Sequence, residues 1–141
     1  MKNWVISEDR EFVSQVGELL IQCTTIEKQL LQIFKKIEEG ESKQNDFSQR
    51  TFGGKISILG KVLKSKKIET RLNSIKEIRN RIAHDIVSYD PIKRKPVIEK
   101  LPNLNLNEEN EKISELITDM QVLILSLDNE NFKNSILKYQ T

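Results

Sequence analysis

The sequence predicts an all-α protein, a bundle of four to five mostly antiparallel helices with an irregular or short β crossover near residues 91–106. Apolar residues recur at steps of three and four over long stretches, which is the period of amphipathic helices. Charged residues make up 31% of the chain and aromatic residues only 6%, which favours a helical protein over a β-sandwich. A chain of 141 residues can bury a core without metal or disulfide links, so we expect one domain, residues 1–141.

The first predicted helix covers about residues 8–39. Its apolar residues alternate in steps of four and three: Phe12, Val16, Leu19, Cys23, Ile26, Leu30, Ile33 and Ile37. This spacing is typical of a coiled-coil seam. Ser7 is a suitable N-cap, and Gly40 marks the expected end of the helix. Residues 40–50 are polar and aperiodic, so we expect a loop there.

Helices are also expected at about 52–64, 67–88 and 108–128, with a short C-terminal helix at about 130–139. Their expected core positions are Phe52, Ile56, Leu59, Val62, Leu63, Leu72, Ile75, Ile78, Ile82, Ile86, Ile113, Leu116, Ile117, Met120, Leu123, Ile124 and Leu127. Asn107 is the expected N-cap of the fourth helix. All three prolines lie between residues 91 and 106, so residues 96–101 are expected to be extended, as a hairpin arm or a crossover.

Composition excludes several classes of function. The net charge of +2 gives no strong overall attraction to nucleic acid, so any RNA binding depends on a local patch. The single cysteine, Cys23, rules out an internal disulfide framework and suits a reducing cytoplasm. No apolar run approaches the roughly 18 residues of a membrane span. The N-terminus meets charged residues too early for a signal peptide, so we expect a cytoplasmic protein with no membrane partner.

The segment Ile78–Asp85 is the most informative part of the chain, because it contains the only histidine, His84. Asn80 lies one helical turn before His84 and shares its face, and Arg81 borders that face. Arg79 lies five residues before His84, about 140° round the helix axis. An imidazole exchanges protons near neutral pH and a guanidinium binds phosphate, so these groups can cut RNA without a metal.

The same segment also has a purely structural interpretation. A histidine near the C-terminal end of a helix interacts favourably with the helix dipole. Arg79 and Arg81 can form surface ion pairs with Glu77 or Asp85, which contribute little to stability. Residue types alone leave this alternative open.

The run Arg79-Asn80-Arg81-Ile82-Ala83-His84 resembles the signature of the HEPN superfamily (higher eukaryotes and prokaryotes nucleotide-binding domains). That signature is an arginine, a polar residue that is often asparagine, a few variable residues and a histidine, on the third helix of a compact helical bundle. The resemblance implies a metal-independent endoribonuclease that needs no cofactor. It further implies a homodimer with one composite cleft, RNA as substrate, and a role in a toxin–antitoxin or phage-defence system. An antitoxin or another defence-system protein is then a further partner.

The resemblance also implies roles for the three catalytic candidates. His84 acts in proton transfer at the ribose 2′-hydroxyl or at the leaving oxygen, and Arg79 stabilises charge on the phosphate. Asn80 orients the histidine or the phosphate. The expected products are a 2′,3′-cyclic phosphate and a 5′-hydroxyl. Two copies of His84, one from each chain, supply the base and the acid.

Several residues are weaker candidates for substrate binding: Arg81, Glu27, Lys61, Lys64, Lys66, Lys67, Lys93 and Arg94. Glu27 lies on the outer part of the first helix, where members of the family often place an acidic or polar group near the cleft. The basic residues follow the second and the motif helices, where they can track an RNA backbone. Charge runs of this size are also common as plain solubility features.

Rival functions differ in how well the residues support them. One histidine and one cysteine give no metal-ligand spacing, and Gly53-Gly54-Lys55 lacks the rest of a phosphate-binding loop. The serious alternative is a non-catalytic interaction or regulatory module similar to the mannitol operon regulator family, which the segment Phe52–Gly60 also resembles. In that case Arg79, Asn80 and His84 join helices together or form a dimer seam.

Overall fold

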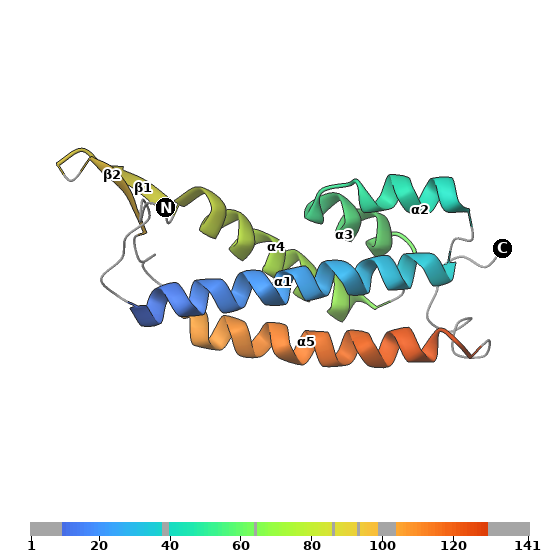
Figure 1. The fold of residues 1–141 in the computed structure, drawn as a ribbon. Coiled ribbons are helices and arrows are strands. Elements are labelled where there is room, and N and C mark those ends of the chain that lie inside the picture. Colours follow the sequence, from blue (N-terminus) through green and yellow to red (C-terminus); the bar gives the residue numbers. More distant parts are fainter. Residues whose placement is uncertain are drawn as a thin grey trace.

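The computed structural model describes residues 10–37, 40–63, 65–85, 87–92, 94–98 and 104–129. These residues form helices with one short antiparallel hairpin, and the predicted all-α class is confirmed (Figure 1). The elements are α1 (Arg10–Ile37), α2 (Glu41–Ser48), α3 (Phe52–Gly60), α4 (Lys66–Asp85), β1 (Val87–Asp90), β2 (Lys95–Ile98) and α5 (Leu106–Ser126).

Helix α1 is the central element, because α2, α3, α4 and α5 all contact it. Its predicted seam is confirmed: seven of the eight positions are buried, and Ile37 is partly buried against them. The predicted core positions of α3, α4 and α5 that lie among the described residues are buried or packed against the core as well. Apolar side chains from each of these helices therefore form one continuous core.

Helices α1 and α5 lie side by side and run in the same direction (Figure 1). A ladder of polar residues at seven-residue intervals joins them. Its members on α1 are Gln15, Gln22, Gln29 and Lys36. Their partners are, in the same order, Asn107, Asn110 and the carbonyl of Ile117 on α5, and Asp128 just beyond the end of α5. Both sets ascend together along the chain, which fixes a parallel register.

The expected antiparallel arrangement is therefore wrong for this pair of helices. Short loops force neighbouring helices to be antiparallel, but the described residues between Ile37 and Leu106 form three helices and a hairpin. This connection returns the chain to the end of the molecule at which α1 begins (Figure 1). Helix α4, in contrast, runs opposite to α1 (Figure 1).

The loop predicted for residues 40–50 is also wrong, because residues 41–48 form helix α2. Phe47 is the only large apolar residue in this segment, so no helical period is visible in the sequence. The ring of Phe47 is buried and stacks on Phe34 of α1, with 4.3 Å between the centroids. Tertiary packing therefore stabilises a helix that the local sequence does not predict.

Side-chain caps define the start of three helices. At α4, the hydroxyl of Ser65 accepts a hydrogen bond of 3.2 Å from the amide of Ile68. Thr51 caps α3, and its hydroxyl accepts a hydrogen bond of 3.0 Å from the amide of Gly54. Asn105, and not the expected Asn107, caps α5 by accepting from the amide of Glu108 at 3.2 Å. The helix begins two residues early because Leu106 is buried in the core.

The other helix ends also differ from expectation by a few residues. Helix α3 ends at Gly60, although the expected span was 52–64, and α4 ends at Asp85, although the expected span was 67–88. Strand β1 follows at once and pairs with β2, with Val87 opposite Ile98 and Asp90 opposite Lys95. β-branched and aromatic residues such as Val87 and Tyr89 favour a strand over a longer helix.

Some predictions fall outside the described residues: the Ser7 cap, the helix at 130–139, and the side chains of Lys64, Ile86 and Lys93. Residues 99–103 of the expected crossover are outside as well. Among the residues that are described, no helix is long and apolar enough to span a membrane.

Candidate functional site

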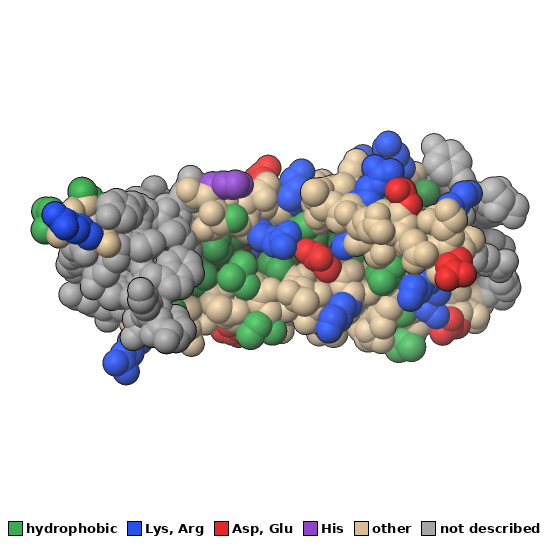
Figure 2. All heavy atoms as spheres, turned by 45° about the horizontal axis from the view of Figure 1, so that its top comes forward, with side chains coloured by type: hydrophobic (Ala, Val, Ile, Leu, Met, Phe, Trp, Pro, Cys, Tyr) green, Lys and Arg blue, Asp and Glu red, His purple; other side chains and the backbone are tan. Residues whose placement is uncertain are grey.

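The motif residues lie on the C-terminal half of α4, which buries one face and exposes the other. Ile78 and Ile82 are buried in the core, whereas Asn80, Arg81 and His84 are exposed. Figure 2 shows the histidine, in purple, at the surface of the molecule. Asn80 and His84 are four residues apart, so they share one exposed face of the helix.

Arg79 occupies a different side of α4 and contacts two other helices. Its Nη2 atom lies 3.3 Å from Oε1 of Glu27 on α1. Its guanidinium also lies over the ring of Phe52 on α3, 5.0 Å from the centroid. The ion pair and the cation–π contact together orient the guanidinium. The side chain of Arg79 remains 37% exposed. Phe52 was expected as a core residue, but its contact with Arg79 was not predicted.

Glu27 binds a second cation, Lys55 of α3, with 3.4 Å between Oε2 and Nζ. The side chain of Lys55 is only 10% exposed and that of Glu27 only 26%. One carboxylate therefore pairs with two basic side chains at the junction of α1, α3 and α4, and the three groups together carry one net positive charge. Glu27 was a weak candidate, and the structure gives it a definite place beside Arg79.

Lys55 was missed as a member of this cluster, although the sequence contains a signal for it. It lies among Phe52, Ile56 and Leu59, which form the apolar face of α3. Glu27 similarly follows Ile26 within the buried face of α1. Charged residues on apolar helix faces are expected to find partners, so a buried pair could have been inferred from the two patterns together.

The thiol of Cys23 lies in the same region, one turn before Glu27 on α1. It is 1% exposed, and burial raises its pKa from the ordinary 9.0 to about 11, partly opposed by the positive charge of Arg79. The thiol is therefore protonated at neutral pH and behaves as a small apolar side chain. It offers no nucleophile to the site.

The structure does not bring the three catalytic candidates together within one chain. Among the described residues, no hydrogen bond or ion pair joins Arg79, Asn80 or His84 to another of the three. Arg79 is turned toward α1 and α3, whereas Asn80 and His84 lie on the face of α4 about 100–140° away. A site that uses both groups on one phosphate therefore needs a second chain or a movement of the arginine.

The basic residues predicted to bind substrate do not form one patch. Lys66 pairs with Glu69 of α4 at 3.8 Å, and Arg81, Lys61 and Lys67 are exposed. Arg94 is exposed too and has a left-handed backbone with φ of 56°. On the face seen in Figure 2, basic side chains are spread among acidic ones. Of this set, only Lys61 lines a described cavity, which lies between α3 and α4.

Within the described part of the chain, no three His, Cys, Asp or Glu side chains are grouped so that they could hold a metal ion. Comparisons of the chain with protein-family models, with curated proteins and with solved structures gave no match.

Proposed function

We propose that this chain is a HEPN-type helical bundle that acts as a metal-independent endoribonuclease, with one composite site at a homodimer interface. The observation that supports the proposal most is the exposure of Asn80 and His84 on one face of α4, while Glu27 and Phe52 hold the guanidinium of Arg79 in place on another side of the same helix. An exposed imidazole on a helix that is anchored by its buried face can meet a substrate in a fixed geometry.

In the proposed reaction, His84 of one subunit removes the proton of the ribose 2′-hydroxyl, and the resulting oxyanion attacks the adjacent phosphorus. The P–O5′ bond breaks, and His84 of the second subunit returns a proton to the leaving 5′-oxygen. Arg79 stabilises the added negative charge on the phosphate. The products are a 2′,3′-cyclic phosphate and a 5′-hydroxyl, with no net consumption of protons.

Two exposed apolar residues support a dimer near this site. Val13 is 36% exposed and Leu20 is 42% exposed. They precede Glu27 by two and one heptads, so they lie on nearly the same side of α1 as Glu27. A second subunit that covers these side chains is then close to the cluster of Arg79 and Glu27. We propose that the protein acts in a toxin–antitoxin or phage-defence system, in the cytoplasm.

The direct test is cleavage of labelled single-stranded RNA in EDTA by the purified protein, beside the variants His84→Ala and Lys112→Gln. Lys112 lies on α5, on the other side of α1 from α3 (Figure 1), and serves as the matched surface control. We expect cleavage that survives EDTA, is unchanged in the control and is lost in His84→Ala. Intact RNA with the wild-type protein contradicts the proposal.

One observation favours a second function, that of a non-catalytic interaction or regulatory module. The contacts of Arg79 with Glu27 and Phe52 join three helices, which is a structural task that needs no substrate. Arg79→Lys separates the two functions, because an ammonium keeps the charge but loses the planar, multidentate donor. Catalysis predicts a folded variant whose cleavage falls by at least about tenfold, whereas the structural role predicts a change in stability alone.

A further inference from the structure

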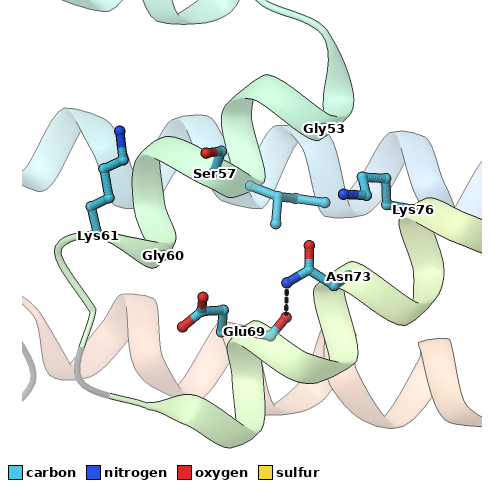
Figure 3. Close-up of a pocket in the computed structure, with 8 residues that line it drawn as sticks. Gly53, Ser57, Gly60, Lys61, Glu69, Asn73 and Lys76 are labelled. Atoms are coloured by element: carbon cyan, nitrogen blue, oxygen red, sulfur yellow. Dashed lines mark hydrogen bonds between the residues drawn. The ribbon is translucent and has the colours of Figure 1, made fainter.

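A cavity of about 460 Å³ opens between α3 and α4 (Figure 3). Its lining consists of Gly53, Ile56, Ser57, Gly60, Lys61, Glu69, Asn73 and Lys76. Small-molecule sites in proteins commonly have volumes of about 300–1,000 Å³. The cavity is thus large enough to hold part of a nucleotide.

Two glycines let side chains of α4 lie directly against α3. A Cβ atom at Gly53 would lie 3.0 Å from Cδ of Lys76, and one at Gly60 would lie 3.3 Å from the carboxylate of Glu69. Larger residues would therefore displace Lys76 and Glu69 from the wall of the cavity. Ser57 lies between the glycines and adds a small, exposed hydroxyl group.

The polar groups that line the cavity differ in the hydrogen-bond partners that the protein gives them. Lys76 extends its ammonium group into the cavity (Figure 3). The side-chain nitrogen of Asn73 donates to the carbonyl of Glu69 at 3.1 Å, which leaves the amide oxygen of Asn73 toward the cavity (Figure 3). Oε2 of Glu69 is buried and accepts no hydrogen bond, and Nζ of Lys66 lies 3.8 Å from it. The side chain of Glu69 is nevertheless 30% exposed, so Oε1 is the carboxylate oxygen that can accept a hydrogen bond from a ligand in the cavity.

Lys76 favours a phosphate, whereas Glu69 and Asn73 present oxygens that accept from hydroxyl or amino groups. A ribonucleotide carries both kinds of group. We propose that the cavity binds one ribonucleotide unit, with its phosphate on Lys76 and a ribose hydroxyl donating to Glu69. Lys61 lies at the rim, where a second phosphate contact is available.

The position of the cavity relates it to the proposed cleavage site. Lys76, Asn80 and His84 follow one another at intervals of four residues, so they form one row along α4. Eight residues of helix separate Lys76 from His84 by about 12 Å. A strand that leaves the cavity along this row reaches His84. The cavity is then a subsite for an RNA nucleotide that flanks the scissile phosphate, an inference that rests on the proposed ribonuclease function for its substrate.

Binding can be measured without cleavage by using His84→Ala as the parent protein. Labelled single-stranded RNA and DNA of the same sequence are titrated over a range of salt concentrations, with Lys76→Gln, Glu69→Gln, Ser57→Leu and, as control, Lys112→Gln. We expect Lys76→Gln to weaken RNA binding and to reduce the salt slope by about 0.7, the value for one phosphate contact on a single strand. Ser57→Leu fills the cavity from an exposed position and weakens binding while the fold is retained. Lys112→Gln leaves both quantities unchanged.

Glu69→Gln tests the ribose contact, because it removes the negative charge but keeps the shape of the side chain. We expect it to weaken RNA binding about fivefold or more while DNA binding stays the same, since the 2′-hydroxyl is the group that DNA lacks. A parallel titration with adenosine 5′-monophosphate distinguishes a free nucleotide from an RNA nucleotide as the ligand. If Lys76→Gln weakens binding of the free nucleotide but not binding of RNA, the cavity is assigned to a mononucleotide.

The outcomes keep the two proposals distinct. RNA and nucleotide binding that no cavity variant alters overturns the subsite, as does a complete lack of binding. If the wild-type protein still cleaves RNA in a His84-dependent manner, the ribonuclease function stands without the subsite. If RNA is never cleaved but binds in a Lys76-dependent manner, the binding site stands and the ribonuclease function does not.

Discussion

The carboxylate of Glu27 lies between Nη2 of Arg79, at 3.3 Å, and Nζ of Lys55, at 3.4 Å. A single acidic side chain of α1 thus holds one basic side chain from α4 and one from α3. Lys55 is nearly buried, so its charge depends on Glu27 for compensation, whereas the partly exposed guanidinium of Arg79 can also be solvated. The cluster therefore serves the fold through Lys55 and the proposed site through Arg79.

Replacement of Glu27 by glutamine is expected to destabilise the protein by about 1–3 kcal/mol, because it leaves the Lys55 ammonium buried without an opposite charge. The double variant Glu27→Gln/Lys55→Met is expected to recover most of this loss, since the methionine needs no partner. Urea unfolding of the wild type and both variants measures the difference. Equal stability of the single and the double variant would show that burial of Lys55 costs nothing.

The polar ladder between α1 and α5 leads to a second prediction. The amide nitrogen of Gln29 donates to the carbonyl of Ile117 at 2.9 Å, but its Oε1 atom is buried without a hydrogen-bond partner. Gln29→Leu removes this unsatisfied oxygen together with the donor, so the free energy of unfolding should stay the same or rise by about 1 kcal/mol. Gln29→Ala should instead lower it by about 2 kcal/mol, because it leaves a cavity.

Chemical denaturation of both Gln29 variants checks this prediction. A loss of 2 kcal/mol or more in Gln29→Leu would mean that the bond to Ile117 is essential for the register of α1 and α5. Circular dichroism of the folded state controls for a change in helix content.

Because the thiol of Cys23 is buried, the stability of the protein depends on pH in the alkaline range. Because burial raises its pKa from 9.0 to about 11, the unfolded chain loses this proton before the folded chain does. The contribution is complete below pH 9 and is lost as the pH rises toward 11, by roughly 3 kcal/mol in total. Cys23→Ala should be less stable at pH 7 through lost packing, but its stability should fall less steeply between pH 9 and 11.

Urea unfolding at a series of pH values gives the two slopes, and their difference isolates the contribution of Cys23 from that of every group that the two proteins share. Parallel slopes for the wild type and Cys23→Ala would show that the thiol ionises as readily in the folded chain as in the unfolded one.

The long amphipathic helices could be predicted because their apolar period depends on local sequence alone. The seam from Phe12 to Ile33 is buried as expected. Helix α2 could not be predicted in this way, because its one anchor, Phe47, acts through a ring of α1 that is distant in sequence. The parallel register of α1 and α5 could not be predicted, because the seven-residue spacing of Gln15, Gln22 and Gln29 does not fix the direction of a partner helix, and their partners on α5 show no such repeat.

In the candidate site too, the features that depend on local sequence could be predicted, and those that depend on tertiary packing could not. Exposure of Asn80 and His84 on one face of α4 follows from helical geometry, as does the separation of Arg79 from that face. The partners of Arg79 do not follow from its own helix, because Glu27 and Phe52 come from α1 and α3. The cavity beside Lys76 likewise depends on how closely Gly53 and Gly60 allow the two helices to approach, which is a tertiary property.

In the proposed reaction, two subunits share the chemistry of one site. If His84 of one chain acts as the base and His84 of the other as the acid, a heterodimer with one His84→Ala subunit keeps only one of the two groups. Its cleavage rate should then fall by about 100-fold or more, because each proton-transfer group contributes about that much. Differently tagged subunits, co-expressed and purified by both tags, supply the heterodimer, and a wild-type/Lys112→Gln heterodimer is the control. A heterodimer with half the wild-type rate would instead mean that each chain carries a complete site, which requires Arg79 to leave Glu27 and reach the His84 face of its own helix.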